Sequence, residues 1–180
     1  MLAADSGKEQ IQSVKLKSLE DIFRALQEAE ARYLVVGGLA VIAHGYVRLT
    51  KDIDLVLDLS SEALPRALNA LQSLGYRPMI PVPLLDFANP ELRHDWIENR
   101  NMKVFNLVSD RYPDVVIDIF PKEPFPFETE FARSEAKEVA PNVLAHVVSV
   151  SALIALKIEA NRERDHDDID KLRKLYPSFP

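Results

Sequence analysis

Residues 18–31 and residues 33–38 show the two kinds of hydrophobic pattern that recur along this chain. In SLEDIFRALQEAEA (18–31) the apolar residues fall three and four positions apart, which predicts a helix with one buried face. YLVVGG (33–38) is apolar up to a pair of glycines, and a short unbroken run of this kind predicts a buried strand. LAVIAHG (39–45) follows directly, so we expect a brief helix that begins after the glycines and ends at Gly45.

The segment DIDLVLDL (52–59) alternates between acidic and apolar residues. A strand places every second side chain on the same face. Asp52, Asp54 and Asp58 therefore share one face, and most of the apolar residues occupy the other. This pattern predicts a second strand with a strongly acidic face soon after the glycine pair.

The remainder of the chain predicts helices and short strands in alternation. The predicted helices cover residues 61–75, 89–100 and 150–176, the last as one helix or as two that join near residues 162–165. The predicted strands cover residues 76–79, 102–109 and 114–120. This alternation indicates an α+β or α/β fold in which helices cover a mixed sheet.

The length and apolar content indicate one well-packed domain. The chain has 180 residues, of which 47% are hydrophobic, enough for one core and a small helical appendage but not for two large domains. We expect a single domain over residues 1–180, with its core at about 18–140 and a C-terminal helical segment at about 149–176.

The charge balance is acidic, with 22 Lys and Arg residues against 28 Asp and Glu residues and a formal net charge of −6. Such a balance disfavours sequence-blind coating of nucleic acid, although a small basic patch still permits local RNA contact. The chain has no cysteine, which excludes disulfide scaffolds, thiolate zinc sites and cysteine nucleophiles. The sequence shows neither a signal-peptide core nor a stretch of about 18 apolar residues, so we expect a soluble, cytoplasmic protein with no membrane partner.

Gly37 and Gly38 stand where a strand turns into a helix. Because glycine has no Cβ, backbone N–H groups there can approach an anion closely, and the start of a helix adds the positive end of its dipole. The pair therefore suits a phosphate group. A plain strand-to-helix turn with unusual backbone angles explains the same two residues, and both interpretations stay open.

Asp52 and Asp54 leave the same strand face about 6.5–7 Å apart at the backbone, so both carboxylates can reach one cation. Mg²⁺ prefers such oxygen ligands together with substrate phosphates, whereas a solvated strand end is the plainer alternative. Asp118 lies in the apolar run VVIDIF (115–120), where an unpaired charge is costly. It needs either an arginine such as Arg48 or a shared metal, and three carboxylates on neighbouring strands can hold two Mg²⁺ ions about 3.5–4 Å apart.

Lys157 falls on the apolar stripe of the last helical segment. It either points its ammonium group toward a bound polyphosphate or extends that group into solvent. The stripe is marked by Val150, Leu153, Ile154 and Ile158. Farther along, charged residues crowd one turn, for which we expect a solvated face with intrahelical ion pairs. That turn contains Arg162, Arg164, Asp165 and Asp168.

Several other kinds of site lack their central parts. His166 and Asp167 resemble the pair of the metal phosphohydrolases, but the other histidines have no telling spacing. The chain has neither the GxSxG motif of serine hydrolases nor the glycine-rich P-loop of NTPases. His44 and Trp96 are predicted to be core or pocket-wall residues.

The chain has, in this order, a glycine pair, a short helix, two aspartates on the next strand and a distant Asp118. This order resembles that of the DNA-polymerase-β-like nucleotidyltransferase superfamily. GGLAVIAHGYVRLTKDIDL (37–55) is similar to small bacterial nucleotidyltransferases related to the AbiEii and MenT toxin components. The resemblance covers residues 34–57 and VVIDIF, and LIALKIEANRERDHDDIDKL (153–172) is similar to the C-terminal helical segment of these relatives. Most of residues 60–110 is unmatched.

The resemblance implies a role for each candidate site residue. Gly37 and Gly38 would hold the triphosphate of an NTP through backbone amides, and Lys157 would contact it. The metal ligands and catalytic carboxylates would be Asp52, Asp54 and Asp118, with Asp118 also helping to deprotonate the acceptor hydroxyl. Arg48 and Thr50 match the lead-in to the aspartates and are predicted to bind nucleotide, whereas Asp165 and Asp168 receive no role. Many superfamily members have Gly-Ser where this chain has Gly37-Gly38, so the hydroxyl of that serine is missing here.

These observations predict a Mg²⁺-dependent nucleotidyltransferase, with two ions expected and Mn²⁺ as a substitute, that transfers NMP from an NTP and releases pyrophosphate. A catalytically silent nucleotide- or partner-binding module is the main alternative, and a phosphodiesterase on the same carboxylates is another. The acceptor stays open between tRNA, a protein hydroxyl and a small molecule, and a cognate antitoxin is a possible partner. We look for acceptor contacts in residues 84–102, around Trp96.

Overall fold

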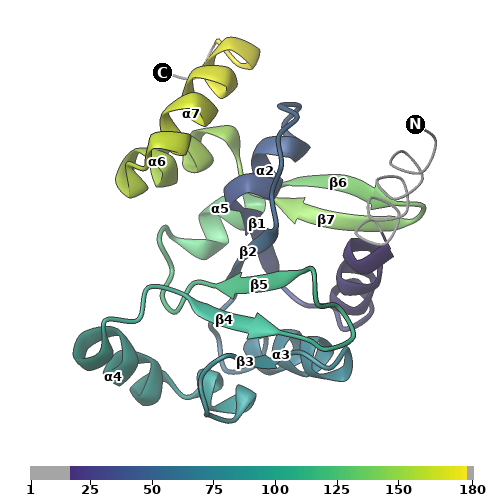
Figure 1. Ribbon diagram of the computed structural model, residues 1–180, viewed down its shortest axis with the longest axis vertical. Coiled ribbons are helices and arrows are strands. Elements are labelled where there is room, and N and C mark those ends of the chain that lie inside the picture. The colour runs from purple at the N-terminus through teal and green to yellow at the C-terminus, as the bar shows by residue number, and fades with distance from the viewer. Residues whose placement is uncertain (1–16, 178–180) are drawn as a thin grey trace, which may run out of the picture.

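The protein is built on one mixed seven-stranded sheet with helices packed around it (Figure 1). A computed structural model describes residues 17–177. The strand order is β3-β4-β5-β2-β1-β7-β6, and parallel and antiparallel pairs both occur. This arrangement confirms the predicted α+β class with a mixed sheet.

The centre of the sheet comes from the two segments that carry the glycines and the first aspartates. β1 (Tyr33–Val36) pairs with β2 (Asp52–Leu57) in the antiparallel sense, and all four residues of β1 are buried. α2 (Gly37–Ala43) connects them and begins at the first glycine, two residues earlier than predicted. Gly37 has a φ of +62°, so it provides the sharp change of direction from strand to helix that other residues disfavour.

β5 (Val116–Ile119) lies parallel to β2 and brings the third aspartate to the first two. Asp54 and Asp118 are direct register partners. On the far side of β5, β4 (Phe105–Val108) and the two-residue β3 (Arg77–Pro78) add antiparallel strands. The three carboxylates therefore project from neighbouring strands, as the sequence pattern predicted.

The predicted helices are present, and their ends follow local sequence signals. Asn89 caps α4 (Pro90–Arg100) by accepting from two backbone N–H groups, as expected for its residue type. The C-terminal segment forms two helices rather than one, α6 (Val150–Ala160) and α7 (Glu163–Leu175), because Asn161 adopts a left-handed conformation between them. Residues 17–28 and α3 (Leu64–Ser73) are the other predicted helices.

Three elements between β5 and α6 were not predicted from the sequence. α5 (Phe127–Arg133) is a short helix that begins with Phe127. β6 (Glu135–Ala140) and β7 (Val143–Val147) form an antiparallel hairpin, and β7 extends the sheet beside β1 in the parallel sense. β6 is an edge strand with mixed charges and no buried residues, so its sequence lacks the apolar alternation that indicates a strand.

The proline-rich segment after β3 is part of the folded core and is not a linker. It contains a 3₁₀ helix, η1 (Leu84–Ala88), whose Phe87 is fully buried. Trp96 is only 4% exposed and stacks on Phe105. The interpretation of Trp96 as a core residue is thus confirmed, and its proposed contact with an acceptor is not supported. Among the described residues no helix is long and apolar enough to cross a membrane.

Candidate functional site

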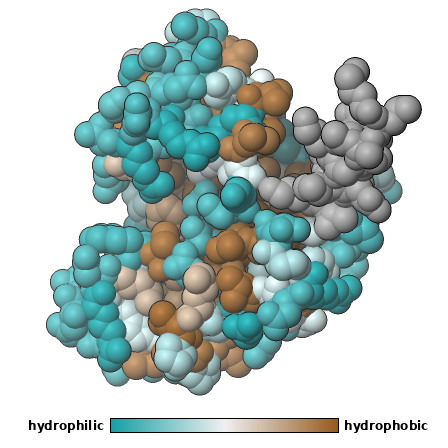
Figure 2. Space-filling model, viewed as in Figure 1, coloured by the Kyte–Doolittle hydropathy of each residue, from teal (hydrophilic) through white to brown (hydrophobic). Residues whose placement is uncertain are grey.

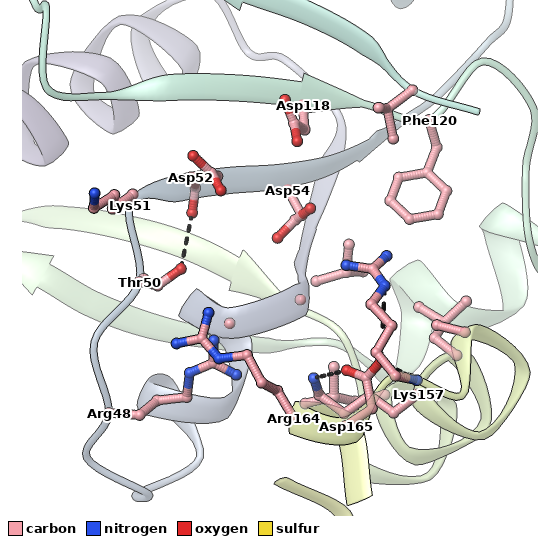
Figure 3. Close-up of a pocket in the computed structure, with 18 of the residues that line it drawn as sticks. Arg48, Thr50, Lys51, Asp52, Asp54, Asp118, Phe120, Lys157, Arg164 and Asp165 are labelled. Atoms are coloured by element: carbon pink, nitrogen blue, oxygen red, sulfur yellow. Dashed lines mark hydrogen bonds and ion pairs between the residues drawn. The ribbon is translucent and has the colours of Figure 1, made fainter. Parts of the chain in front are cut away.

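All the residues predicted for the site line one cavity of about 530 Å³ (Figure 3). Its floor is made by α2, β2 and β5, and its opposite wall by α6 and the start of α7. The predicted residues that line it are Gly37, Gly38, Arg48, Thr50, Asp52, Asp54, Asp118 and Lys157. The structure therefore brings together residues that are up to 120 positions apart along the chain.

Gly37 is required by the carboxylate of Asp54. A Cβ atom built on Gly37 would lie 1.9 Å from Oδ2 of Asp54, a distance at which one of the two groups must move. Asp54 also accepts a hydrogen bond from the backbone N–H of Gly38. The glycine pair and the second aspartate are thus parts of one local arrangement, and the plain-turn interpretation leaves this contact unexplained.

Gly38 leaves room for two polar groups from the loop that precedes β2. A Cβ atom on Gly38 would lie 2.7 Å from Oγ1 of Thr50 and 3.2 Å from Nη2 of Arg48. The Thr50 hydroxyl therefore occupies the region into which a serine side chain at position 38 would extend. This overlap gives a physical reason for glycine at a position where many superfamily members have serine.

The three aspartates concentrate negative charge in one part of the cavity. Burial, together with the charges of Asp118 and Asp52, raises the pKa of Asp54 to about 6. Burial also raises the pKa of Asp118, whose carboxylate accepts a hydrogen bond of 2.7 Å from the side-chain amide of Asn106. Within residues 17–177, no Lys or Arg side chain forms an ion pair with any of the three.

The buried carboxylates elsewhere in the protein have cationic partners. Asp58 accepts from Arg32 at 2.7 Å, so the third aspartate of the predicted acidic face lies outside the cavity and has a structural partner. Glu130 is paired with Arg133. Asp54 and Asp118 are partly exposed and Asp52 is exposed, so the cavity carboxylates differ from these two in being open to solvent and in lacking an ion-pair partner among the described residues.

The donor atoms fit Mg²⁺, which prefers carboxylate oxygens. In the part of the chain from 17 to 177, no group of three acidic, histidine or cysteine side chains is arranged closely enough to hold a metal ion as it stands. The fit therefore rests on the donor types, on their convergence from β2 and β5, and on their uncompensated charge.

Lys157 is held by two aspartates of α7. Its Nζ atom donates to Asp165 at 3.0 Å and to Asp168 at 2.7 Å, and Lys157 is only 5% exposed. The alternative in which its ammonium group extends into solvent is therefore wrong. Contact between Lys157 and a triphosphate stays a prediction, because Lys157 lines the cavity while its charge is already balanced by Asp165 and Asp168.

The charged turn at the start of α7 is solvated only in part. Its two arginines are exposed, as expected, and Arg162 forms an ion pair with Asp165 within the turn, but both aspartates are buried. Asp165 and Asp168 are 8% and 2% exposed, and their partners come mainly from other elements. Asp168 accepts from Arg48 as well as from Lys157. Arg48 therefore does not neutralise Asp118, which was the alternative to a metal. It instead connects the part of the cavity around Gly38 to α7.

Two arginines and a lysine of the cavity were missed as site residues. Arg162, Arg164 and Lys51 all line it, and in Figure 3 Arg164 extends from α7 toward the helix that begins with the glycines. Arg162 lowers the pKa of both Asp54 and Asp118 by its charge. The two arginines stand in the cation-rich sequence after α6, but they were not considered as site residues because that sequence was interpreted as a solvated turn.

The apolar stripe of α6 also differs from the prediction at one end. Val150, Leu153 and Ile154 are buried as expected, but Ile158 is 54% exposed and Lys157 takes the buried place. α6 therefore directs Lys157, and not Ile158, toward the protein interior, and apolar side chains remain on its outer face.

A family model described as "Nucleotidyl transferase AbiEii toxin, Type IV TA system" matches residues 20–176. The chain belongs to this AbiEii nucleotidyltransferase family. Membership confirms the resemblance inferred from the glycine and aspartate pattern and identifies the protein as a nucleotidyltransferase. No curated protein matches the sequence.

Several solved structures share the fold. The lincosamide antibiotic adenylyltransferase LnuA, bound to lincomycin, has a TM-score of 0.59 and 18% identity over 88% of this chain and 96% of its own. The antibiotic-resistance factor ANT(2'')-Ia gives 0.57 and 18% over 91% and 84%. JHP933 from Helicobacter pylori gives 0.54 and 16% over 93% and 68%. At these identities the likeness establishes the fold alone.

Proposed function

We propose that this AbiEii family member transfers the NMP group of an NTP to an acceptor hydroxyl and releases pyrophosphate, with Mg²⁺ as its cofactor. The proposal rests on one observation. The same cavity is lined by carboxylates that form no ion pair with the described residues and by cationic side chains that form none either. Lys51 and Arg164 line this cavity, and the described residues 17–177 provide no carboxylate within ion-pair distance of either. A metal-bound triphosphate supplies both missing partners.

The cation-rich side of the cavity is suited to the triphosphate. Arg48 is anchored by Asp168 and lies against Gly38, so its guanidinium is preorganised for a phosphate oxygen. Arg164 adds a second guanidinium, and Gly37 and Gly38 line the same cavity, where the N–H of Gly38 donates to Asp54. These groups would neutralise charge on the β- and γ-phosphates and orient the leaving pyrophosphate.

The carboxylate side is suited to the reacting phosphorus and the acceptor. Two Mg²⁺ ions, or Mn²⁺ in their place, would be held by Asp52, Asp54 and Asp118 and would supply Lewis-acid stabilisation. Asp118, held in place by Asn106, accepts the acceptor's hydroxyl proton. The acceptor oxygen forms its bond to the α-phosphorus as the bond to the bridging oxygen of pyrophosphate breaks, and that oxygen keeps the electron pair.

Thr50 is proposed to replace the serine hydroxyl that the chain lacks at position 38. Thr50→Ala is expected to lower kcat/KM for NTP about tenfold, because one phosphate donor is lost. Gly38→Ser alone is expected to be at least as harmful, since its Cβ meets the Thr50 hydroxyl. The double variant should recover part of the activity, because Gly38 has no positive φ and removal of the Thr50 hydroxyl relieves the 2.7 Å contact, while the Cβ of residue 50 stays 3.1 Å away.

Steady-state kinetics of the wild type, both single variants and the double variant measure this coupling. Losses in the double variant that equal the product of the two single losses would contradict a shared hydroxyl position.

Cellular context is part of the proposal. A cytoplasmic location fits an enzyme that uses NTPs, and a cognate antitoxin fits the family description of a type IV toxin–antitoxin system. The neighbours LnuA and ANT(2'')-Ia show that this fold occurs in adenylyltransferases of small antibiotics, so a small-molecule acceptor stands beside tRNA and protein.

The test is incubation of the protein with each α-³²P-labelled NTP and Mg²⁺ in a cell lysate, beside an Asp52→Asn/Asp54→Asn double variant. We expect label transfer and pyrophosphate release by the wild type and neither by the variant. Metal removal with EDTA should stop both, and added Mg²⁺ should restore them. Equal labelling by the double variant would refute the assignment.

The rival function is a silent nucleotide- or partner-binding module. It predicts Mg²⁺-dependent NTP binding without pyrophosphate release, or no NTP binding. Isothermal titration of the wild type with a non-hydrolysable ATP analogue separates these outcomes from active turnover.

A further inference from the structure

A second hollow of about 310 Å³ lies on the outer side of α6, next to the loop that leads into α5. Its α6 wall consists of Ser151, Ala152, Ala155, Leu156 and Glu159, which follow one another at helical spacing and form a single stripe. The other walls are formed by Pro124, Phe125 and Glu130. The hollow is thus an apolar slot that carries one hydroxyl and two carboxylates.

The second hollow adjoins the nucleotide cavity through Leu156, which lines both. The nucleotide cavity uses the neighbouring stripe of α6, with Leu153, Lys157 and Ala160. The two stripes share Leu156, so α6 forms a continuous wall from one hollow to the other. Figure 2 shows a recess between the part of the molecule where Figure 1 places α6 and α7 and the part where it places α4, with apolar residues inside it.

The two hollows differ in the charge of the side chains that line them. The first hollow is lined by Arg48, Lys51, Arg162 and Arg164, whereas neither lysine nor arginine lines the second. Of its two carboxylates, Glu130 already accepts from Arg133 and from the hydroxyl of Ser149. Glu159 is exposed, and no Lys or Arg side chain of residues 17–177 forms an ion pair with it. A cation brought by a ligand has Glu159 as its available counter-charge.

The geometry of the transfer reaction points the acceptor toward this second hollow. The attacking and leaving oxygens stand roughly in line across the α-phosphorus. If the leaving pyrophosphate lies with Arg48 and Arg164, the acceptor must approach from the opposite side of the carboxylates. In Figure 3 Phe120 lies on the other side of the aspartates from Arg48 and Arg164. Leu156 lines the same cavity and is its border with the second hollow.

We infer that the slot between α6 and the Pro124–Phe125 loop binds the acceptor, and that this acceptor is a small amine that bears hydroxyl groups, such as an amino sugar. The inference rests on the proposed transfer function. Glu159 pairs with an ammonium group, the ring of Phe125 attracts the same cation and covers apolar ring faces, and an acceptor hydroxyl reaches Asp118. A phosphodiester backbone lacks complementary charge in the slot, which disfavours RNA there.

The test uses kanamycin A as a cationic acceptor and its per-N-acetylated derivative as a neutral counterpart with the same hydroxyls. With Mg²⁺ and α-³²P-ATP or α-³²P-GTP, we expect kanamycin A to be labelled at least tenfold more efficiently than the acetylated compound. Glu159→Gln should raise KM for kanamycin A about tenfold, and Glu159→Lys should raise it further. KM for NTP should not change, because Glu159 does not line the nucleotide cavity.

Glu163→Gln is the matched control, since Glu163 is also exposed and lines neither hollow. Its kinetics should equal those of the wild type. Transfer to RNA or protein but not to kanamycin A, or equal use of both kanamycin forms, overturns the inference and leaves the transfer function standing. An absence of kanamycin A binding to the Mg²⁺–nucleotide complex also overturns it. If no NTP binds at all, the proposed function itself has failed.

Discussion

Asp54→Asn is expected to slow NMP transfer at least about a thousandfold, which corresponds to about 4 kcal/mol of lost transition-state stabilisation. Asp54 is the central carboxylate of the proposed metal site, in register with Asp118 and two residues from Asp52 on the same strand face. Asparagine keeps its shape but removes the charge. Transfer of α-³²P label, measured over a range of Mg²⁺ concentrations, checks the loss.

The same substitution is expected to stabilise the metal-free protein by about 2 kcal/mol at pH 8. The pKa of Asp54 is raised to about 6 from an ordinary 3.8, so the folded state binds this proton more tightly than the unfolded state. Wild-type stability therefore increases as pH falls from above 6 toward 4. The advantage of Asp54→Asn should shrink over the same interval, and thermal unfolding at several pH values measures it.

Asp58→Asn is the matched control on the same segment. Asp58 is buried and paired with Arg32 outside the cavity, so this variant should lose stability and keep transfer activity. The two aspartates thus have opposite expected effects on both measurements. An Asp54→Asn protein that is less stable than the wild type but fully active would contradict the assignment.

Asp168→Asn is expected to destabilise the protein by about 3–5 kcal/mol, the range for breaking a buried ion pair. Asp168 is 2% exposed and accepts from both Lys157 and Arg48, so removal of its charge leaves two cations with one fewer counter-charge. Thermal unfolding should show a decrease of the melting temperature of about 6–15 °C for a chain of this size.

The loss of Asp168 should also weaken nucleotide binding at temperatures where the variant is folded. Arg48 then has no anchor beside Gly38, so KM for NTP should rise about tenfold, whereas kcat should change less. Asp167→Asn is the control, because Asp167 is exposed and accepts from the Tyr46 hydroxyl. Its effect on stability should stay within about 0.5 kcal/mol. Equal effects of the two substitutions would show that the buried network does not support the site.

Local sequence determined the central part of the fold. The apolar run before Gly37, the alternation through Asp52 and Asp54 and the apolar run around Asp118 each have a period that belongs to one kind of element. Strands with these patterns can bury their apolar faces only by pairing in one sheet, and the three aspartates then face the same side. For this reason the candidate carboxylates could be predicted from sequence.

The hairpin of β6 and β7 and the short helix α5 could not be predicted in this way. β6 joins the sheet only by pairing with β7, and β7 pairs with β1, which lies more than 100 residues earlier in the chain. Pairing of this kind satisfies backbone hydrogen bonds without leaving a strong periodic pattern in an exposed edge strand.

Only the tertiary structure decided which charges have partners. Sequence proximity suggested that Asp165 and Asp168 pair within their own helix turn. Asp165 does pair with Arg162 there, but both aspartates are also buried against Lys157 of α6. Asp58 repeats the pattern of Asp52 and Asp54, yet Arg32 neutralises it. Residue order determined on which strands and faces the carboxylates stand. The cost of a buried charge depends on what lies within a few ångströms in space. The packing of α6, α7 and the loop before β2 therefore determined which carboxylates remain available to a metal.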